Sequence, residues 1–211
     1  MVKMLGAMLE GSLVSLEVFF LTLVFALPLA LPVALGRMAG SRLLAIPINL
    51  YILVMRGTPR ILQIIFVYFA PYYFFEASYD RFTAVIVAFV LNYAAYFAEI
   101  YRGGIQSIPR GQYEAAKVLG FTRVDTFFRI VLPQVVKRIL PATANETITL
   151  VKDTALAQTI GVAELFRVAQ NASARQFSTM PIFVAGAFYF VMNWAVSELF
   201  LRAERKLEYY R

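Results

Sequence analysis

Four polar residues suited to binding a small charged molecule lie in one otherwise apolar stretch, at Asn145, Glu146, Thr149 and Asp153. The spacing i, i+1, i+4 and i+8 places their side chains along one side of a helix. If the stretch crosses a membrane, such groups face the interior of a helix bundle or a water-filled path. We therefore predict that this stripe lines a path for a polar solute. The alternative is an internal ion pair, for Glu146 with an arginine of residues 112–133.

The composition indicates a membrane protein without disulfide or thiolate chemistry. The chain has 211 residues, of which 60% are hydrophobic and 16% charged. It has no cysteine and no histidine, so the usual catalytic base and the commonest metal ligand are missing. A G-x-x-x-x-G-K-[ST] motif is also missing, so ATP should be hydrolysed by another chain. We predict an all-α membrane protein with a single domain over residues 1–211, which is not an enzyme and binds no metal or cofactor.

A polar, basic segment at residues 112–133 separates the apolar runs. The helix formers of its first half are Glu114, Ala115, Ala116, Lys117 and Leu119. Gly120 stands where a left-handed helix end needs a residue without a Cβ atom. Thr122 and Asp125 form a capping pair for a second helix, which Pro133 is expected to end. The pattern predicts a helix, a tight glycine turn and a second helix; an ordinary amphipathic interfacial loop is the alternative.

About five apolar runs are predicted to cross the membrane. They cover residues 12–36, 59–72, 82–98, 139–160 and 181–201. A short interfacial helix over residues 43–55 should end at the Gly-Thr-Pro sequence of residues 57–59. Residues 71–81 should form an aromatic external loop, and a short helix over residues 163–170 should precede the last run.

The basic residues orient these runs. With the amino terminus outside and the carboxyl terminus in the cytoplasm, about three quarters of the 20 Lys and Arg residues lie on the cytoplasmic side. The net charge of +7 is therefore a topology signal, and we expect no nucleic acid partner.

Three further side chains are candidates for the solute path. Glu17 lies near the outer end of the first run, Glu198 near the inner end of the last, and Tyr68 in an aromatic stretch. Acids beside a path favour a cationic solute. The alternatives are that the acids extend to the membrane surface and that Tyr68 is an interface anchor. Glu99 and Arg102 are expected to form an ion pair at the cytoplasmic mouth.

Several motifs resemble one family. Residues 114–116 (Glu-Ala-Ala), Gly120 and residues 130–133 (Ile-Val-Leu-Pro) resemble the EAA signature of the membrane-spanning subunits of ABC importers. Arg-Gly-Thr-Pro at residues 56–59 and Ala-Glu-Ile-Tyr-Arg at residues 98–102 resemble its polar amino acid branch, the histidine, arginine and glutamine permeases. The resemblance covers nearly the whole chain.

This resemblance implies a type I ABC importer permease fold and a multi-pass protein of a bacterial inner membrane. The loop at about residues 107–133 would be the cytoplasmic coupling segment, which docks into a groove of the ATPase. The residues implied in that contact are Glu114, Ala115, Ala116, Lys117, Gly120 and Phe121. The implied partners are a dimer of ATPase subunits that carries ATP and Mg, a second permease subunit (identical or paralogous), and an extracytoplasmic amino acid binding protein.

The predicted function is the translocation path of an ATP-driven amino acid importer. The acidic candidates favour basic substrates such as arginine, histidine or lysine, and glutamine or glutamate is the alternative. An ion-gradient-driven secondary transporter would need an inverted repeat, and the sequence shows none. A non-transporting scaffold would leave the polar run at residues 139–160 without a purpose.

Overall fold

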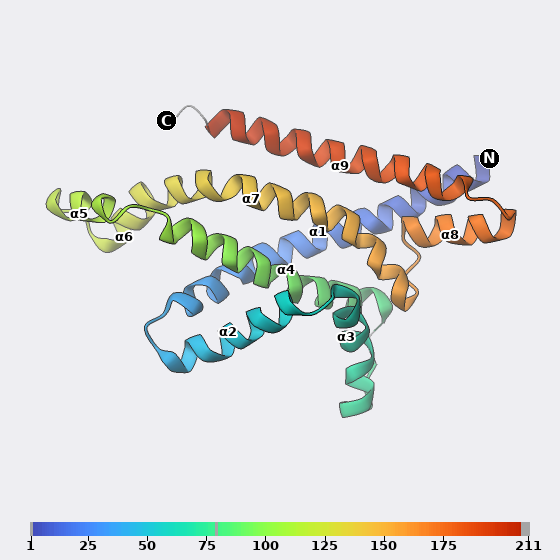
Figure 1. Ribbon diagram of the computed structural model, residues 1–211, viewed down its shortest axis with the longest axis horizontal. Helices are drawn as coiled ribbons and strands as arrows, with labels where there is room; N and C mark the ends of the chain where they lie inside the picture. Colours follow the sequence, from blue (N-terminus) through green and yellow to red (C-terminus); the bar gives the residue numbers. More distant parts are fainter. Residues whose placement is uncertain (1, 79, 208–211) are drawn as a thin grey trace.

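The computed structural model describes residues 2–78 and 80–207, and within that part of the chain there are helices and no strands. Four long helices run roughly along the long axis of the molecule (Figure 1): α1 (Val2–Met38), α4 (Arg81–Gln106), α7 (Leu132–Asp153) and α9 (Met180–Leu207). The N-terminal end of α1 and helix α8 lie at one end of this bundle. Helices α5 and α6 project at the opposite end, toward which α9 also runs.

The core of the bundle lies where α1 packs on α4. Alanines recur every four residues on the buried face of α1, at Ala26, Ala30 and Ala34. Small residues let two helix backbones approach closely, which leaves room for large side chains on the other helix. Phe89 and Tyr93 of α4 fill that room and are almost completely buried.

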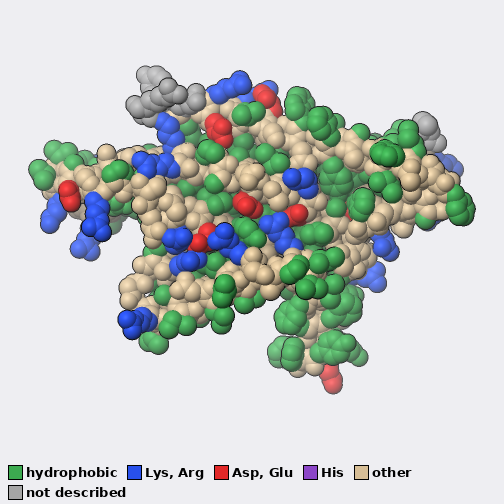
Figure 2. Space-filling view, viewed as in Figure 1, with side chains coloured by type: hydrophobic (Ala, Val, Ile, Leu, Met, Phe, Trp, Pro, Cys, Tyr) green, Lys and Arg blue, Asp and Glu red, His purple; other side chains and the backbone are tan. Residues whose placement is uncertain are grey.

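The predicted break at Gly-Thr-Pro is confirmed. α2 (Arg42–Gly57) and α3 (Arg60–Phe75) are bent by 115° at this point. Thr58 is extended, as expected before a proline, and its hydroxyl donates to the Val54 carbonyl at 2.8 Å. α3 leaves the bundle sideways and is covered with hydrophobic side chains (Figures 1 and 2). Because α3 continues to Phe75, the prediction of a loop beginning at residue 71 is wrong.

Pro133 does not end the second helix of the 112–133 segment, contrary to prediction. A π-helical stretch, Thr126–Val131, leads directly into α7. The wide turn is closed by the N–H of Leu132, which donates to the carbonyl of Phe127. Pro133 then falls in the first turn of α7, where its missing N–H costs little. The helix that contains the predicted polar span of residues 139–160 therefore begins earlier, at residue 132. It ends at Asp153, and residues 154–160 form a 3₁₀ helix instead of an α-helix.

Among the described residues, three helices are long and apolar enough to cross a membrane, namely α1, α4 and α9. The bent α2–α3 pair adds a fourth if it counts as one span. α7 has 22 residues but is too polar to meet the same criterion. Two other helix boundaries also differ from those predicted. α1 begins at Val2, not at residue 12, and α8 covers Leu165–Gln176, not residues 163–170. The side of the membrane on which each end lies remains a prediction.

Candidate functional site

The coupling segment, residues 107–133, has the predicted glycine turn. α5 (Arg110–Val118) ends at a Gly120 whose φ of +80° is favourable only for a residue without a Cβ atom. The Phe121 N–H donates to the Ala116 carbonyl at 3.0 Å and closes the turn. Thr122 then caps α6 (Arg123–Asp125) by accepting a hydrogen bond from the Asp125 N–H at 3.1 Å.

The tip of this segment presents an apolar surface at one end of the molecule (Figure 2). Val118 and Leu119 are 87% and 73% exposed. Ala116, which was also predicted to contact the ATPase, is buried. The other predicted contact residues are accessible: Glu114, Ala115, Lys117, Gly120 and Phe121. Exposed apolar residues rimmed by charge mark interaction surfaces. Sequence reasoning missed Val118 and Leu119, whose exposure depends on the turn.

A second site is centred on Arg60, the first residue of α3. Its Nε donates to Asn92 Oδ1 at 3.0 Å, and its Nη1 donates to the Tyr93 hydroxyl at 3.2 Å and also contacts Asp153. The Tyr93 hydroxyl donates to Asp153 Oδ2 at 2.7 Å. Glu146 lies farther away, with Oε2 at 3.8 Å from Arg60 Nη2. We call these five residues the Arg60 cluster; they come from α3, α4 and α7.

The helix break positions Arg60. Gln63 donates to the carbonyls of Met55 and Thr58 at 3.0 and 3.2 Å, across the break. Its own oxygen accepts a hydrogen bond from the Asn92 amide at 2.8 Å. These bonds tie both sides of the break to α4, so the guanidinium of Arg60 is directed at α7.

The Arg60 cluster has one guanidinium and two carboxylates, so its formal charge is −1. Glu146 Oε2 is buried and accepts no hydrogen bond within residues 2–78 and 80–207. An ionised buried oxygen is favourable only with a donor or a positive charge nearby. The cluster can therefore take up one further cationic donor.

Of the predicted path residues, two lie in the Arg60 cluster and the others lie outside it, among them Glu198, which pairs with Arg202 of its own helix at 2.8 Å. Glu146 and Asp153 meet in the Arg60 cluster, and the ion pair of Glu146 is made with Arg60, not with an arginine of the coupling segment. Thr149 donates to the Asn145 carbonyl of its own helix at 3.0 Å, and Asn145 is exposed. Two other candidates lie apart from the cluster: Glu17 is exposed on α1, and Tyr68 is half-buried with its ring 4.8 Å from that of Phe69.

Arg60, Asn92 and Tyr93 were not predicted as site residues. Two of them could have been found from the sequence. Arg60 directly follows the Gly-Thr-Pro break, and Asn92 is a polar residue in an otherwise apolar run. Tyr93 carries no such signal, since tyrosines are frequent in this chain.

The predicted ion pair between Glu99 and Arg102 is confirmed, with Arg102 Nη2 at 3.0 Å from Glu99 Oε2. Arg37 and Arg56 contact the same carboxylate, Arg56 at 3.4 Å. We call these four residues the Glu99 cluster. It joins the last turns of α1 and α2 to α4.

Glu164, which sequence reasoning missed, is completely buried at the N-terminus of α8. It accepts hydrogen bonds from the backbone N–H groups of Phe166 and Arg167, both at 2.7 Å, and from the Tyr189 hydroxyl at 2.8 Å. Burial raises the pKa of the Glu164 carboxyl above its ordinary value, and these donors oppose the rise. The described residues contain no cluster of three or more acidic side chains suited to a metal.

Comparison with known proteins agrees with this arrangement. Residues 22–209 match the family described as "Binding-protein-dependent transport system inner membrane component". The chain belongs to that family. A solved structure entitled "Crystal structure of an amino acid ABC transporter with histidines" is 34% identical to the permease, with a TM-score of 0.90. The alignment covers 98% of this chain and 96% of the other.

Two relatives have named substrates. The octopine transport system permease protein OccM of Rhizobium radiobacter is 37% identical over 94% of this chain and 84% of its own length. The glutamine transport system permease protein GlnP of Escherichia coli is 36% identical over 95% and 93%. The permease is thus a membrane subunit of an amino acid ABC importer, and a separate ATPase hydrolyses ATP. The family works with that ATPase and a binding protein. Because the named substrates differ, the prediction of basic amino acids is not confirmed.

Proposed function

We propose that the permease imports a basic amino acid (arginine, histidine or lysine) and that the Arg60 cluster lies on its path. The observation that carries this proposal is the net negative cluster whose Glu146 Oε2 accepts no hydrogen bond among the described residues. An ammonium or guanidinium group would supply both the donor and the missing positive charge. Asp153 would then hold Arg60 in place while Glu146 contacts the solute.

Two of the similar proteins bear on the substrate. The amino acid transporter solved with histidines supports a substrate of the basic set. GlnP is named for glutamine, which supports the neutral alternative. A glutamine side chain is uncharged and would leave the cluster with its charge of −1.

The test is ATP-driven uptake of labelled arginine into proteoliposomes that contain the permease, its ATPase and its binding protein. Lysine and histidine should compete, and glutamine and glutamate should not. Glu146→Gln should raise the KM for transport about 10-fold to 100-fold, the effect of losing one charge-assisted hydrogen bond. Glu198→Gln, a partly buried acid that pairs only with Arg202 of its own helix among the described residues, is the matched control and should leave the KM unchanged. Competition by glutamine equal to that by lysine would contradict the assignment.

We further propose that the coupling segment docks onto the ATPase through the exposed Glu114, Ala115, Lys117, Gly120 and Phe121, with the buried Ala116 beneath them, and that ATP and Mg stay on that partner. The exposed Val118 and Leu119 support an apolar contact. Gly120→Asp forces a side chain into a backbone with φ of +80°, at a cost of about 1–2 kcal/mol. Gly111→Asp is the control, since a Cβ atom at Gly111 meets nothing within 4 Å and its φ is not positive. The ATPase should co-purify with the control and not with Gly120→Asp; equal recovery would refute the docking surface.

We propose a multi-pass protein of a bacterial inner membrane, with five spans, the amino terminus outside and the carboxyl terminus in the cytoplasm. The N-terminal end of α1 and the coupling segment lie at opposite ends of the bundle, which supports their placement on opposite sides of the membrane (Figure 1). The excess of Lys and Arg on the side of the coupling segment supports this orientation. The chain has no cysteine, so a maleimide labels only the single cysteine that is introduced. An impermeant maleimide should label Lys3→Cys in intact cells and should not label Arg123→Cys. The reverse pattern would invert the topology.

We propose that two permease subunits, identical or paralogous, enclose the path, because three or four apolar spans are too few to surround a polar solute. The mass of the detergent-solubilised complex should correspond to two permease chains and two ATPase chains. A single permease chain in that complex would exclude this arrangement.

A further inference from the structure

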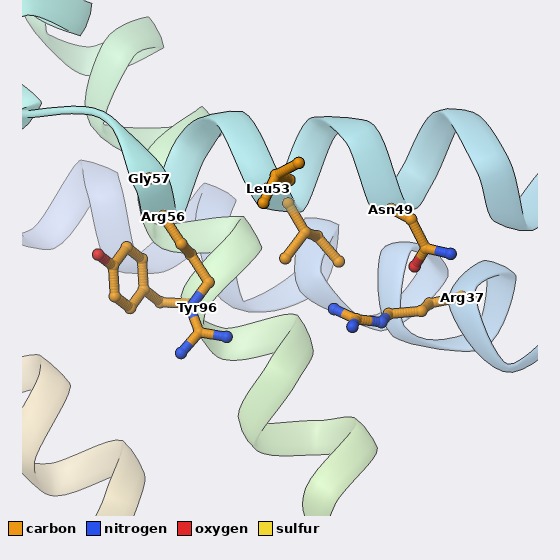
Figure 3. Close-up of a pocket in the computed structure, with 7 residues that line it drawn as sticks. Arg37, Asn49, Leu53, Arg56, Gly57 and Tyr96 are labelled. Atoms are coloured by element: carbon orange, nitrogen blue, oxygen red, sulfur yellow. The ribbon is translucent and has the colours of Figure 1, made fainter.

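A cavity of about 560 Å³ lies between the end of α1, helix α2 and helix α4. Figure 3 shows that Asn49 and Arg56 point from α2 into the same space that Arg37 enters from α1, with the ring of Tyr96 beside them. We call this space the basic pocket. No residue of the Arg60 cluster and none of the proposed substrate-path residues lines it. The two sites are neighbours, because Arg60 lies against the same Tyr96 ring, with its Cζ atom 4.9 Å from the ring centroid.

The two arginines that line the basic pocket belong to the Glu99 cluster, which carries a surplus of positive charge. Three guanidinium groups contact the single carboxylate of Glu99, which leaves a formal charge of +2. Among residues 2–78 and 80–207, Glu99 is the one acid within ion-pair distance of Arg37 or Arg56. Each of these two arginines reaches Glu99 through one terminal nitrogen, so each keeps further N–H donors for another acceptor.

The arginines are partly withdrawn from solvent but accessible from the pocket. The side chain of Arg37 is 27% exposed and that of Arg56 is 45% exposed. Arg56 lies over the Tyr96 ring, with its Cζ atom 5.3 Å from the ring centroid. That stacking fixes the plane of the guanidinium and leaves its edge free for hydrogen bonds.

The same helix presents an apolar surface next to the charges. Leu43, Leu50 and Leu53 of α2 are 87%, 60% and 69% exposed, and Leu53 also lines the pocket. A membrane protein places such residues against acyl chains. The site therefore combines donors for an anion with a surface for hydrocarbon, and a free solute would use only the first.

We propose that the basic pocket binds the headgroup of an acidic phospholipid, with the phosphodiester between Arg37 and Arg56 and the acyl chains along α2. Guanidinium groups match phosphate oxygens in geometry and bind them through paired hydrogen bonds. Basic pockets between membrane helices are sites of this kind. The Asn49 amide would donate to a headgroup oxygen. The bound lipid would brace α2, and through the Glu99 cluster it would hold the ends of α1 and α4.

The test titrates the purified permease–ATPase complex in detergent with phosphatidylglycerol and counts bound lipid by native mass spectrometry. The wild type should bind phosphatidylglycerol saturably and more tightly than phosphatidylcholine. Arg56→Gln should weaken that binding about fivefold, which corresponds to about 1 kcal/mol per basic residue. Arg42→Gln removes the same charge at the start of α2, away from the pocket lining, and should have no such effect.

A second variant keeps the outcome decisive if Arg56→Gln fails to fold. Asn49→Asp removes no contact of the Glu99 cluster and adds a carboxylate in reach of the pocket arginines. It should weaken phosphatidylglycerol binding at least as much as Arg56→Gln does.

Two results would overturn the proposal. Equal weakening by Arg42→Gln and the pocket variants would show diffuse attraction to α2 instead of a site. Displacement of phosphatidylglycerol by an equal concentration of inorganic phosphate would show that the pocket takes the free anion and not a lipid.

Discussion

Replacing Glu164 by alanine should destabilise the folded permease by about 3–5 kcal/mol, among the largest losses expected for one side chain. The residue is completely buried, and its two oxygens accept three hydrogen bonds no longer than 2.8 Å. A hydrogen bond to a charged group contributes about 1.5–3 kcal/mol. Alanine would leave two backbone N–H groups and the Tyr189 hydroxyl buried without acceptors, and it would remove the cap of α8.

The measurement is thermal unfolding in detergent, followed by far-ultraviolet circular dichroism. For a chain of this length, 1 kcal/mol corresponds to about 2–4 °C, so the expected decrease in Tm is about 6–20 °C. Glu198→Ala is the matched control because it removes an i, i+4 ion pair with Arg202 whose partners are 33% and 69% exposed. It should change the stability by less than about 0.5 kcal/mol.

Glu164→Gln distinguishes the carboxylate from a neutral group of the same shape. The amide retains one oxygen acceptor, but its NH₂ group would face a donor, so we expect a loss of about 1–3 kcal/mol. If Glu164→Gln unfolds at the wild-type temperature, the ionised carboxylate is unnecessary and the argument from its donors is wrong.

Two further predictions concern α4. A Cβ atom at Gly104 would overlap the Ile139 Cγ2 methyl group, whereas one at Gly103 would meet nothing within 4 Å. Gly104→Val should therefore be about 1–3 kcal/mol less stable than Gly103→Val in the same unfolding assay, and equal stabilities would mean that α4 and α7 do not pack as described. At the start of α4, hydrogen bonds from Thr83 lower the pKa of Asp80 below its ordinary value. The ionised carboxylate therefore stabilises the folded state at a pH above the ordinary aspartate pKa. This stabilisation is lost as the pH falls through the pKa of Asp80 in the folded state. Asp80→Asn keeps the cap without the charge, so the difference from the wild type should be present at pH 7 and vanish at low pH; a constant difference would rule out the charge as its cause.

Local signals predicted local structure well. The positive φ of Gly120, the Thr122 cap and the break at residues 57–59 are confirmed, because each depends on the conformational limits of a few neighbouring residues. The ends of the helices were predicted less well. Pro133 was expected to end a helix, and the π-helical stretch before it could not be seen in residue types, since it depends on how α6 joins α7.

The membrane class, the family and the helix–turn–helix around Gly120 were determined by the sequence alone, because hydropathy and contiguous motifs are properties of the chain in order. The polar stripe on α7 was visible as well, but its partners were not. The tertiary structure decided that Arg60 meets Glu146 and Asp153, that Arg37 and Arg56 converge on Glu99, and that Glu164 is buried. These contacts join residues 43 to 93 positions apart or depend on α8 packing against α1 and α9, and only the packing of helices brings such residues within a few ångströms.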